Sequence, residues 1–306
     1  MASSITFKSV AKKSKGKTVL ADLSFGIEER SAFALVGRNG SGKSLVLRLL
    51  SGLSKSNKGN IYIKGQDILT RSSEIQSIIG YMPQSNYLNE SLKPIDNLMY
   101  FCKICGMQKK ESEGKINSWA DRLGLTENDL NTYTSRLSFS TTRKIIFARS
   151  IIHDPEILLF DEPTRGMDSI NASNLWDIID SLKRSKTIIF STSDLSSVER
   201  YADRIGIINN GSMRMLGTMD SLINSTEGIA LFEIDLEGEV DKELMDRFNE
   251  NKKILKPEYK GHRLSFYSRE KKYFFMVLKE IIHLGVRDIK LKKYKLRNII
   301  ENMVGG

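Results

Sequence analysis

Residues 32–44 read Ala-Phe-Ala-Leu-Val-Gly-Arg-Asn-Gly-Ser-Gly-Lys-Ser, a short apolar run followed at once by a glycine-rich segment. A continuous apolar run of this length is typical of a buried parallel strand. The residues from Gly42 to Leu50 continue with apolar side chains at helical spacing. The stretch therefore predicts a strand, a loop and a helix in direct succession, which is the repeating unit of a wound α/β sheet.

The loop of this unit, Gly37 to Ser44, matches the pattern G-x-x-x-x-G-K-[ST]. Glycines let backbone N–H groups surround phosphates, and the following helix N-terminus adds positive potential. Lys43 is expected to reach the β- and γ-phosphates of a nucleotide, and the Ser44 hydroxyl to ligate Mg²⁺. An ordinary glycine-rich loop is the alternative, which the spacing and the preceding strand disfavour. The candidate nucleotide-binding residues are Gly37, Asn39, Gly40, Ser41, Gly42, Lys43, Ser44 and Leu45.

A second apolar run, Ile157 to Phe160, ends in two carboxylates. Asp161 at the strand tip can hold Mg²⁺ directly or through water, while Glu162 can orient or deprotonate an attacking water. An acidic pair at a strand end means little by itself. Together with the phosphate loop it predicts a site for nucleotide hydrolysis.

The surrounding sequence predicts how these two motifs are carried. Alternating apolar residues before Glu28 indicate antiparallel strands at a sheet edge, and Asn210-Gly211 predicts a hairpin. Between about 88 and 150 the pattern is helical, with no clear strand. Further strand patterns occur at 78–82, 187–191 and 204–208. We therefore expect a wound mixed sheet with an antiparallel edge and a helical insertion.

A second pattern begins near residue 227 and predicts the element order βαββαβ, which is that of a small ferredoxin-like α+β domain. Its expected elements are a strand at 229–236, a helix at 241–251, a hairpin at 254–268, a helix at 270–284 and a strand at 288–293. The sequence thus predicts two domains, residues 1–226 and 227–306.

Composition narrows the compartment and the partners. Cys102 and Cys105 rule out a disulfide framework, and their C-x-x-C spacing lacks the further ligands that a metal site needs. No apolar run is long enough to span a membrane and no secretion signal is apparent, so we expect a cytosolic chain that touches membrane only through a partner. The formal net charge of +10 favours a basic face beside an anionic membrane surface over nucleic-acid recognition.

Residues around both motifs resemble those of the ATP-binding-cassette (ABC) ATPases. Tyr81-Met82-Pro83-Gln84 resembles the family's Q-loop, and the stretch from Asp161 to Asp168 resembles its Walker B strand and D-loop. Residues 143–149 look like the helix that follows the family's signature sequence. The resemblance covers about residues 5 to 220. It implies that Gln84 contacts metal and water and that Asp168 lies at a dimer contact.

The resemblance also implies a function. It is that of an ATP- and Mg²⁺-binding ATPase subunit that powers an ABC transporter from the cytoplasmic side of the cell membrane. Such subunits work as a dimer of cassettes beneath separate integral membrane permease subunits. Cassettes followed by a small α/β domain are typical of ABC-2-type exporters, and residues 289–304 resemble the strand and short helix that end that domain.

Several family positions carry other residues here. Ser14 stands where an aromatic ring usually stacks on adenine, and Ser193 stands where the family has its switch histidine. The signature reads Leu-Ser-Phe-Ser-Thr at 137–141; it keeps Ser138, which would meet the γ-phosphate of the partner's nucleotide, but has Ser140 in place of a glycine. The resemblance assigns catalytic roles to Glu162, Gln84 and Ser193.

These departures leave two readings open. The first is a transport ATPase with slow turnover, and the alternative is a catalytically weak nucleotide-binding structural or regulatory subunit. An ABC-type protein of DNA repair or translation would need a long coiled-coil insertion or a second cassette, and the sequence has neither. The transported substrate and the direction of transport are not encoded in this subunit.

Overall fold

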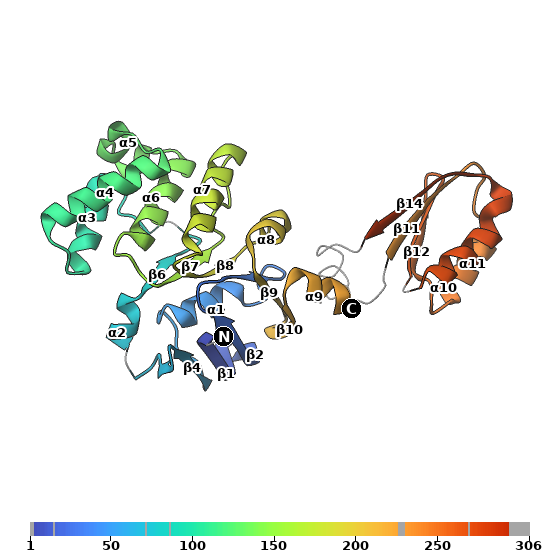
Figure 1. The fold of residues 1–306 in the computed structure, drawn as a ribbon, viewed down its shortest axis with the longest axis horizontal. Coiled ribbons are helices and arrows are strands. Elements are labelled where there is room, and N and C mark those ends of the chain that lie inside the picture. The colour runs from blue at the N-terminus through green and yellow to red at the C-terminus, as the bar shows by residue number, and fades with distance from the viewer. Residues whose placement is uncertain are drawn as a thin grey trace. The chain divides into compact units, whose positions relative to one another are not determined.

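The computed structural model describes residues 3–14, 16–70, 72–85, 87–225, 230–268 and 270–293. The chain divides into two compact units, Met1–Thr218 and Met219–Gly306 (Figure 1). Each unit has its own apolar core. The domain boundary expected between residues 226 and 227 stays a prediction.

A six-stranded sheet forms the centre of the first unit. Its strands are β3 (Ala32–Val36), β6 (Ile79–Met82), β7 (Ile157–Asp161), β8 (Thr187–Ser191), β9 (Arg204–Asn209) and β10 (Ser212–Gly217). They lie in the order β10-β9-β3-β8-β7-β6, all parallel except β10. β3, β7 and β8 are buried at every residue, which explains their continuous apolar runs. The predicted wound sheet is confirmed, with β10 as its antiparallel edge.

The N-terminal strands form a second, antiparallel sheet. Its strands are β1 (Ser3–Ser14), β2 (Lys17–Glu28), β4 (Lys58–Ile63) and β5 (Gln66–Asp67), in the order β2-β1-β4-β5. The sequence predicts β1 and β2 as antiparallel strands at a sheet edge. They do pair with each other, but β1 pairs on its other side with β4, so the two strands belong to this separate sheet and do not extend the wound sheet. Their one apolar face still packs on that sheet, since the ring of Phe25 stacks on Phe7 at 4.4 Å and on Phe33 at 5.7 Å between centroids.

Helices fill the insertion, as the sequence predicts. They are α3 (Pro94–Ile104), α4 (Lys109–Leu123), α5 (Glu127–Asn131), the 3₁₀ helix η1 (Thr134–Arg136) and α6 (Phe139–Ile151), drawn in green in Figure 1. α5 begins with a capping box between Thr126 and Asp129, and Trp119 of α4 meets Phe147 of α6 edge to face. The other helices of this unit are α1 (Lys43–Leu50), α2 (Ser72–Ser77), α7 (Ser169–Leu182) and α8 (Leu195–Tyr201).

Three further features bear on partners and ligands. Within the described residues, no helix has both the length and the apolar character that a membrane span requires. Cys102 is buried on α3, Cys105 is exposed at the C-cap of that helix, and both thiols are free. In the same part of the chain, no group of three or more His, Cys, Asp or Glu side chains is arranged to hold a metal ion.

The second unit has the predicted βαββαβ order. After α9 (Met219–Ser225) come β11 (Ala230–Leu236), α10 (Lys242–Glu250), β12 (Leu255–Lys260), β13 (Arg263–Ser268), α11 (Lys271–Ile281), the 3₁₀ helix η2 (Ile282–Leu284) and β14 (Val286–Lys293). The strands form an antiparallel sheet in the order β12-β13-β11-β14. The short helix expected before Val304 lies outside the described residues.

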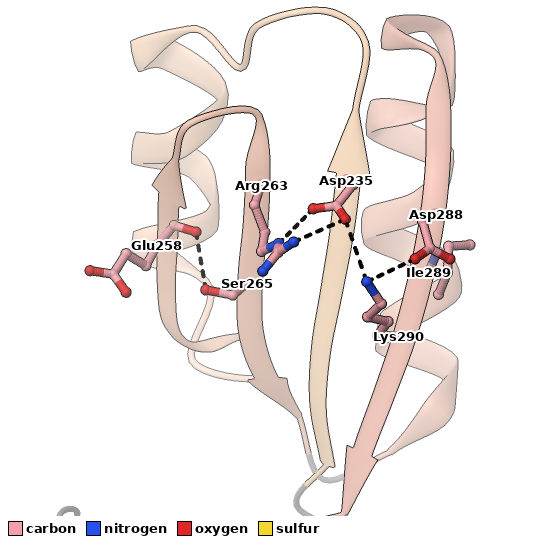
Figure 2. Close-up of polar contacts among 7 residues, drawn as sticks. All are labelled: Asp235, Glu258, Arg263, Ser265, Asp288, Ile289 and Lys290. Atoms are coloured by element: carbon pink, nitrogen blue, oxygen red, sulfur yellow. Dashed lines mark hydrogen bonds and ion pairs between the residues drawn. The ribbon is translucent and has the colours of Figure 1, made fainter.

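One face of this sheet is polar, and Figure 2 shows its contacts. Asp235 of β11 accepts two hydrogen bonds from Arg263 of β13, at 2.5 and 3.1 Å, and lies 3.9 Å from the ammonium of Lys290 on β14. Lys290 in turn pairs with Asp288 at 3.0 Å. The opposite face carries the apolar core, built around Phe232, Ile234 and Phe266 among others. Asp235 thus pairs with cations on both neighbouring strands, Arg263 of β13 and Lys290 of β14.

Candidate active site

The phosphate loop joins the carboxyl end of β3 to the N-terminus of α1. Gly37 leaves no room for a side chain, because a Cβ there would lie 2.1 Å from the carbonyl oxygen of Ile208. Gly42 has a φ of 110°, which favours glycine, and it offers α1 no side-chain cap. Since the first turn of α1 also carries no acidic residue, the positive end of this helix remains open to an anion.

Lys43 is folded back over this loop. Lys43 is only 6% exposed, and its Nζ donates hydrogen bonds to the carbonyl oxygens of Gly37 at 2.7 Å and Arg38 at 3.0 Å. Burial lowers the pKa of Lys43, and the carboxylates of Glu162 and Asp161 act in the opposite direction. The ammonium is therefore already held where the loop would receive a phosphate.

Asp161 ends β7 and is 3% exposed. Its Oδ1 accepts hydrogen bonds from the hydroxyls of Ser44 at 3.0 Å and Ser191 at 2.5 Å. The Ser44 hydroxyl and the Asp161 carboxylate are hard oxygen donors side by side, which is the donor type that Mg²⁺ prefers. Sequence reasoning missed Ser191; its only signal is a hydroxyl at the end of a buried apolar strand that pairs with β7.

Glu162 follows directly, and its φ of 48° is unusual for a residue other than glycine. Its Oε2 accepts hydrogen bonds from the backbone N–H of Ser193 at 3.2 Å and from the Ser193 hydroxyl at 3.3 Å. Two of the predicted catalytic residues thus contact each other across the ends of β7 and β8. Ser193 holds the Glu162 carboxylate rather than standing free beside it.

Part of this set of residues lines a cleft of about 640 Å³; Gly37, Asp161 and Ser193 are not among its lining residues. The predicted site residues that line it are Asn39, Gly40, Gly42, Lys43, Ser44, Leu45, Gln84 and Glu162. Ser41 is buried in the loop, and within the described chain its Oγ has no hydrogen-bond partner. A polar atom left unpaired at the phosphate loop fits a ligand that would satisfy it, since buried polar groups are normally hydrogen-bonded.

Ser138 is not among the residues that line this cleft in the described structure. It is exposed at the N-cap of α6, where its Oγ accepts a hydrogen bond from the backbone N–H of Thr141 at 3.1 Å. Ser138 is therefore exposed to solvent, apart from the cleft that its own phosphate loop lines.

The cleft is also lined from β1 and β2, by Lys12, Ser14 and Val19. None of its described lining residues carries an aromatic ring. Ser14 thus lies at the cleft with no ring beside it that could stack on a base. A missing base-stacking contact costs roughly 1–3 kcal/mol of binding free energy, or about one to two decades in affinity. Sequence reasoning missed Lys12, Arg48 and Arg165 as lining residues, because no local pattern marks them.

Comparisons with known proteins agree with this geometry. Residues 20–165 match the family model described as ABC transporter. An uncharacterized ABC transporter ATP-binding protein of Methanocaldococcus jannaschii is 34% identical over 207 residues, which are 67% of this chain and 74% of the relative. The Nod factor export ATP-binding protein I of Burkholderia orbicola is 30% identical over 231 residues, or 75% and 76% of the two chains.

A solved structure shares the fold. It is a dimeric ABC cassette in a post-hydrolysis state with ADP and Pi bound; its TM-score is 0.65 at 23% identity, covering 70% of this chain and 98% of that one. The family match includes the phosphate loop, Gln84, Ser138 and both carboxylates at the end of β7, Asp161 and Glu162. This chain belongs to the ABC transporter family of ATP-binding proteins, which are ATPases.

Proposed function

We propose that this chain hydrolyses ATP–Mg²⁺ and thereby powers transport through a separate integral membrane permease. The observation that supports this most is the meeting of Lys43, Asp161 and Glu162 at one open phosphate loop. The Burkholderia relative is named as an export protein, which supports an exporter. The chain would lie on the cytoplasmic side of the cell membrane, held there by the permease, without a nucleic-acid partner.

The side chains divide the chemistry among them. Lys43 neutralises charge on the β- and γ-phosphates, and Ser44, Asp161 and Gln84 would hold Mg²⁺, which screens the same phosphates when bound. Glu162 orients the attacking water or takes its proton. Ser193 keeps the Glu162 carboxylate in place through its N–H and hydroxyl.

A second cassette would complete the site. Ser138 is exposed and lies off its own cleft, so it can reach the γ-phosphate only of a nucleotide bound to another copy or to a related cassette. The solved ABC cassette that shares this fold is itself dimeric. Either a homodimer or a heterodimer would satisfy this arrangement.

The permease is proposed to dock on the surface between Gln84 and about Leu125. A groove of about 740 Å³ borders this surface: Phe101, Ile104 and Cys105 line it from the segment itself, and residues 51–53, several residues between 73 and 81, and His153 supply the rest of its lining. A second hollow of about 340 Å³ adds Tyr87, with Arg48 and Arg149. Ile104 is 65% exposed, and apolar side chains gathered at a groove are typical of an interaction site.

A photo-reactive residue placed at Ile104 should cross-link to the permease, because Ile104 lines the proposed docking groove. The matched control is Ile282 of the second unit, which is 63% exposed and should give no such product. Mass spectrometry of the purified complex would locate the cross-links. Products found only through residues 229–306 would refute this docking surface.

Turnover should be slow, and replacing Ser193 by histidine should raise it at least tenfold. Serine is shorter than histidine and uncharged, and losing one preorganised stabilising group typically costs about 10²–10³ in rate. Phosphate release by the complex under saturating ATP is the measurement. An equal or lower rate for Ser193→His would show that this position does not stabilise the transition state.

The comparisons do not favour the alternative of a purely structural or regulatory subunit.

A further inference from the structure

Arg143, near the N-terminus of α6, is a buried cation whose hydrogen bonds are all to backbone. The residue is 2% exposed. A guanidinium has five N–H donors in a rigid fork, and all five are used here. Nε donates to the carbonyl oxygen of Pro163 at 3.2 Å. One terminal nitrogen, Nη1, donates to the carbonyl oxygens of Pro83 at 2.9 Å and Gln84 at 3.0 Å. The other, Nη2, donates to the carbonyl oxygens of Glu162 at 2.9 Å and Pro163 at 3.1 Å.

These acceptors belong to two separate loops of the active site. Pro83 and Gln84 follow β6, and the Gln84 side chain lines the cleft. Glu162 and Pro163 follow β7. β6 and β7 are paired only as far as Met82 and Phe160, so beyond those residues the strand ladder no longer fixes one loop against the other. One planar side chain does so instead.

The burial of this group is not explained by packing alone. Burial lowers the pKa of Arg143 to about 10, while Asp161 and Glu162 act in the opposite direction, so the side chain stays charged at neutral pH. Taking a charge out of water is costly, so a buried charged group is weak evidence for a stabilising role. A buried guanidinium that contacts the backbone of Gln84 and of Glu162 is therefore better accounted for by the geometry it imposes than by stability.

The same end of α6 is fixed to the segment after β7 at two more points. A Cβ at Gly166 would lie 2.8 Å from the ring of Phe139, so this ring packs directly on the glycine. The Ser140 hydroxyl donates to Asp168 at 2.9 Å. Phe139 and Ser140 both belong to the altered signature at residues 137–141. The signature end of α6 and the segment 162–168 are thus joined side by side, with Arg143 extending the connection to Gln84.

We propose that Arg143 is a positioning residue that holds the Gln84 loop and Glu162 in fixed register with each other and with the signature end of α6. The inference rests on the proposed function, because it assigns Gln84 and Glu162 to the metal and the water. Arg143 itself would touch neither nucleotide nor metal. Its effect would be to keep the metal-binding amide and the catalytic carboxylate at the right separation.

Two variants test this, Arg143→Lys and Arg143→Gln, in the full chain with its permease. Lysine keeps the charge but has three donors on one nitrogen and cannot span both loops. Because a displacement of about 1 Å can cost about 10²-fold in rate, we expect kcat to fall about 10- to 100-fold in both variants. KM for ATP should stay within about threefold. The control is Lys144→Gln, which removes a charge from the next residue of α6.

A second measurement does not need turnover. Calorimetry with ATP in EDTA and with ATP–Mg²⁺ gives the factor by which Mg²⁺ tightens binding. Both Arg143 variants should lose most of that factor and keep the affinity for free ATP, because the loop containing Lys43 is not contacted by Arg143. Circular dichroism gives the folded fraction, to which all rates are normalised.

Two results would overturn the inference: an Arg143→Lys variant with wild-type kcat and wild-type Mg²⁺ dependence, or a loss of kcat that disappears once the folded fraction is taken into account. The proposed function is judged separately, on the unsubstituted protein. If that protein binds ATP–Mg²⁺ but releases no phosphate, the proposed hydrolysis fails, and the Mg²⁺ dependence still decides the role of Arg143.

Discussion

Replacing Lys43 by alanine should abolish measurable binding of ATP–Mg²⁺. The ammonium is buried and aimed along the phosphate loop, where it donates to the Gly37 and Arg38 carbonyls. A hydrogen bond to a charged group is worth about 1.5–3 kcal/mol, so losing contacts to two phosphates removes roughly 3–6 kcal/mol. That corresponds to about two to four decades in affinity. Isothermal titration calorimetry on the purified chain is the measurement.

The matched control is Lys58→Ala, which removes an exposed lysine from β4 in the same unit. It should bind ATP–Mg²⁺ as the unsubstituted chain does. Circular dichroism of both variants would separate a lost contact from a lost fold, since Lys43→Ala also leaves two carbonyl oxygens short of a donor. An unchanged affinity in a folded Lys43→Ala variant would remove the assignment of residues 37–44 as the nucleotide site.

Three strands of the wound sheet could be predicted because they are buried on both faces. β3, β7 and β8 therefore appear as continuous apolar runs that need no knowledge of their neighbours. The N-terminal strands show the limit of such patterns. Alternation correctly indicates one buried face for β1 and β2, but it does not reveal that β1 pairs with β4, more than forty residues away. Pairing is decided by packing across the fold.

At the active site, too, features that lie in one stretch of sequence could be predicted, and features made by contacts between distant residues could not. The phosphate loop is contiguous in sequence, so its pattern identifies every residue of it at once. The roles suggested for Ser191 and Arg143 depend on contacts across 30 and about 60 residues, respectively, to Asp161 and to Gln84. A hydroxyl ending an apolar strand, or an arginine in a helix, has no local signal of such a contact. The roles of Ser191 and Arg143 can be recognised only in the folded protein, where β6, β7 and β8 end side by side.

The other large effect is expected at Glu162. Replacing it by glutamine keeps the size and an oxygen that can accept from Ser193, but removes the negative charge and the capacity to take a proton. General-base catalysis contributes about 10²–10⁴ in rate, so phosphate release should fall at least about 100-fold below an already slow value. Affinity for ATP–Mg²⁺ should change by less than about threefold, because the phosphates are held by the loop and Lys43.

The matched control is Glu156→Gln at the other end of β7, where Glu156 is exposed and pairs with Lys64. It removes the same charge from the residue just before β7, away from the cleft, so this variant should hydrolyse ATP at the unsubstituted rate. Retained binding with lost turnover in Glu162→Gln alone would locate the defect in the chemical step. An unchanged rate in Glu162→Gln would mean that another group activates the water. A rate near 10 per second in the unsubstituted complex, the median for enzymes, would contradict slow turnover, because Ser193 would then be no handicap to the transition state.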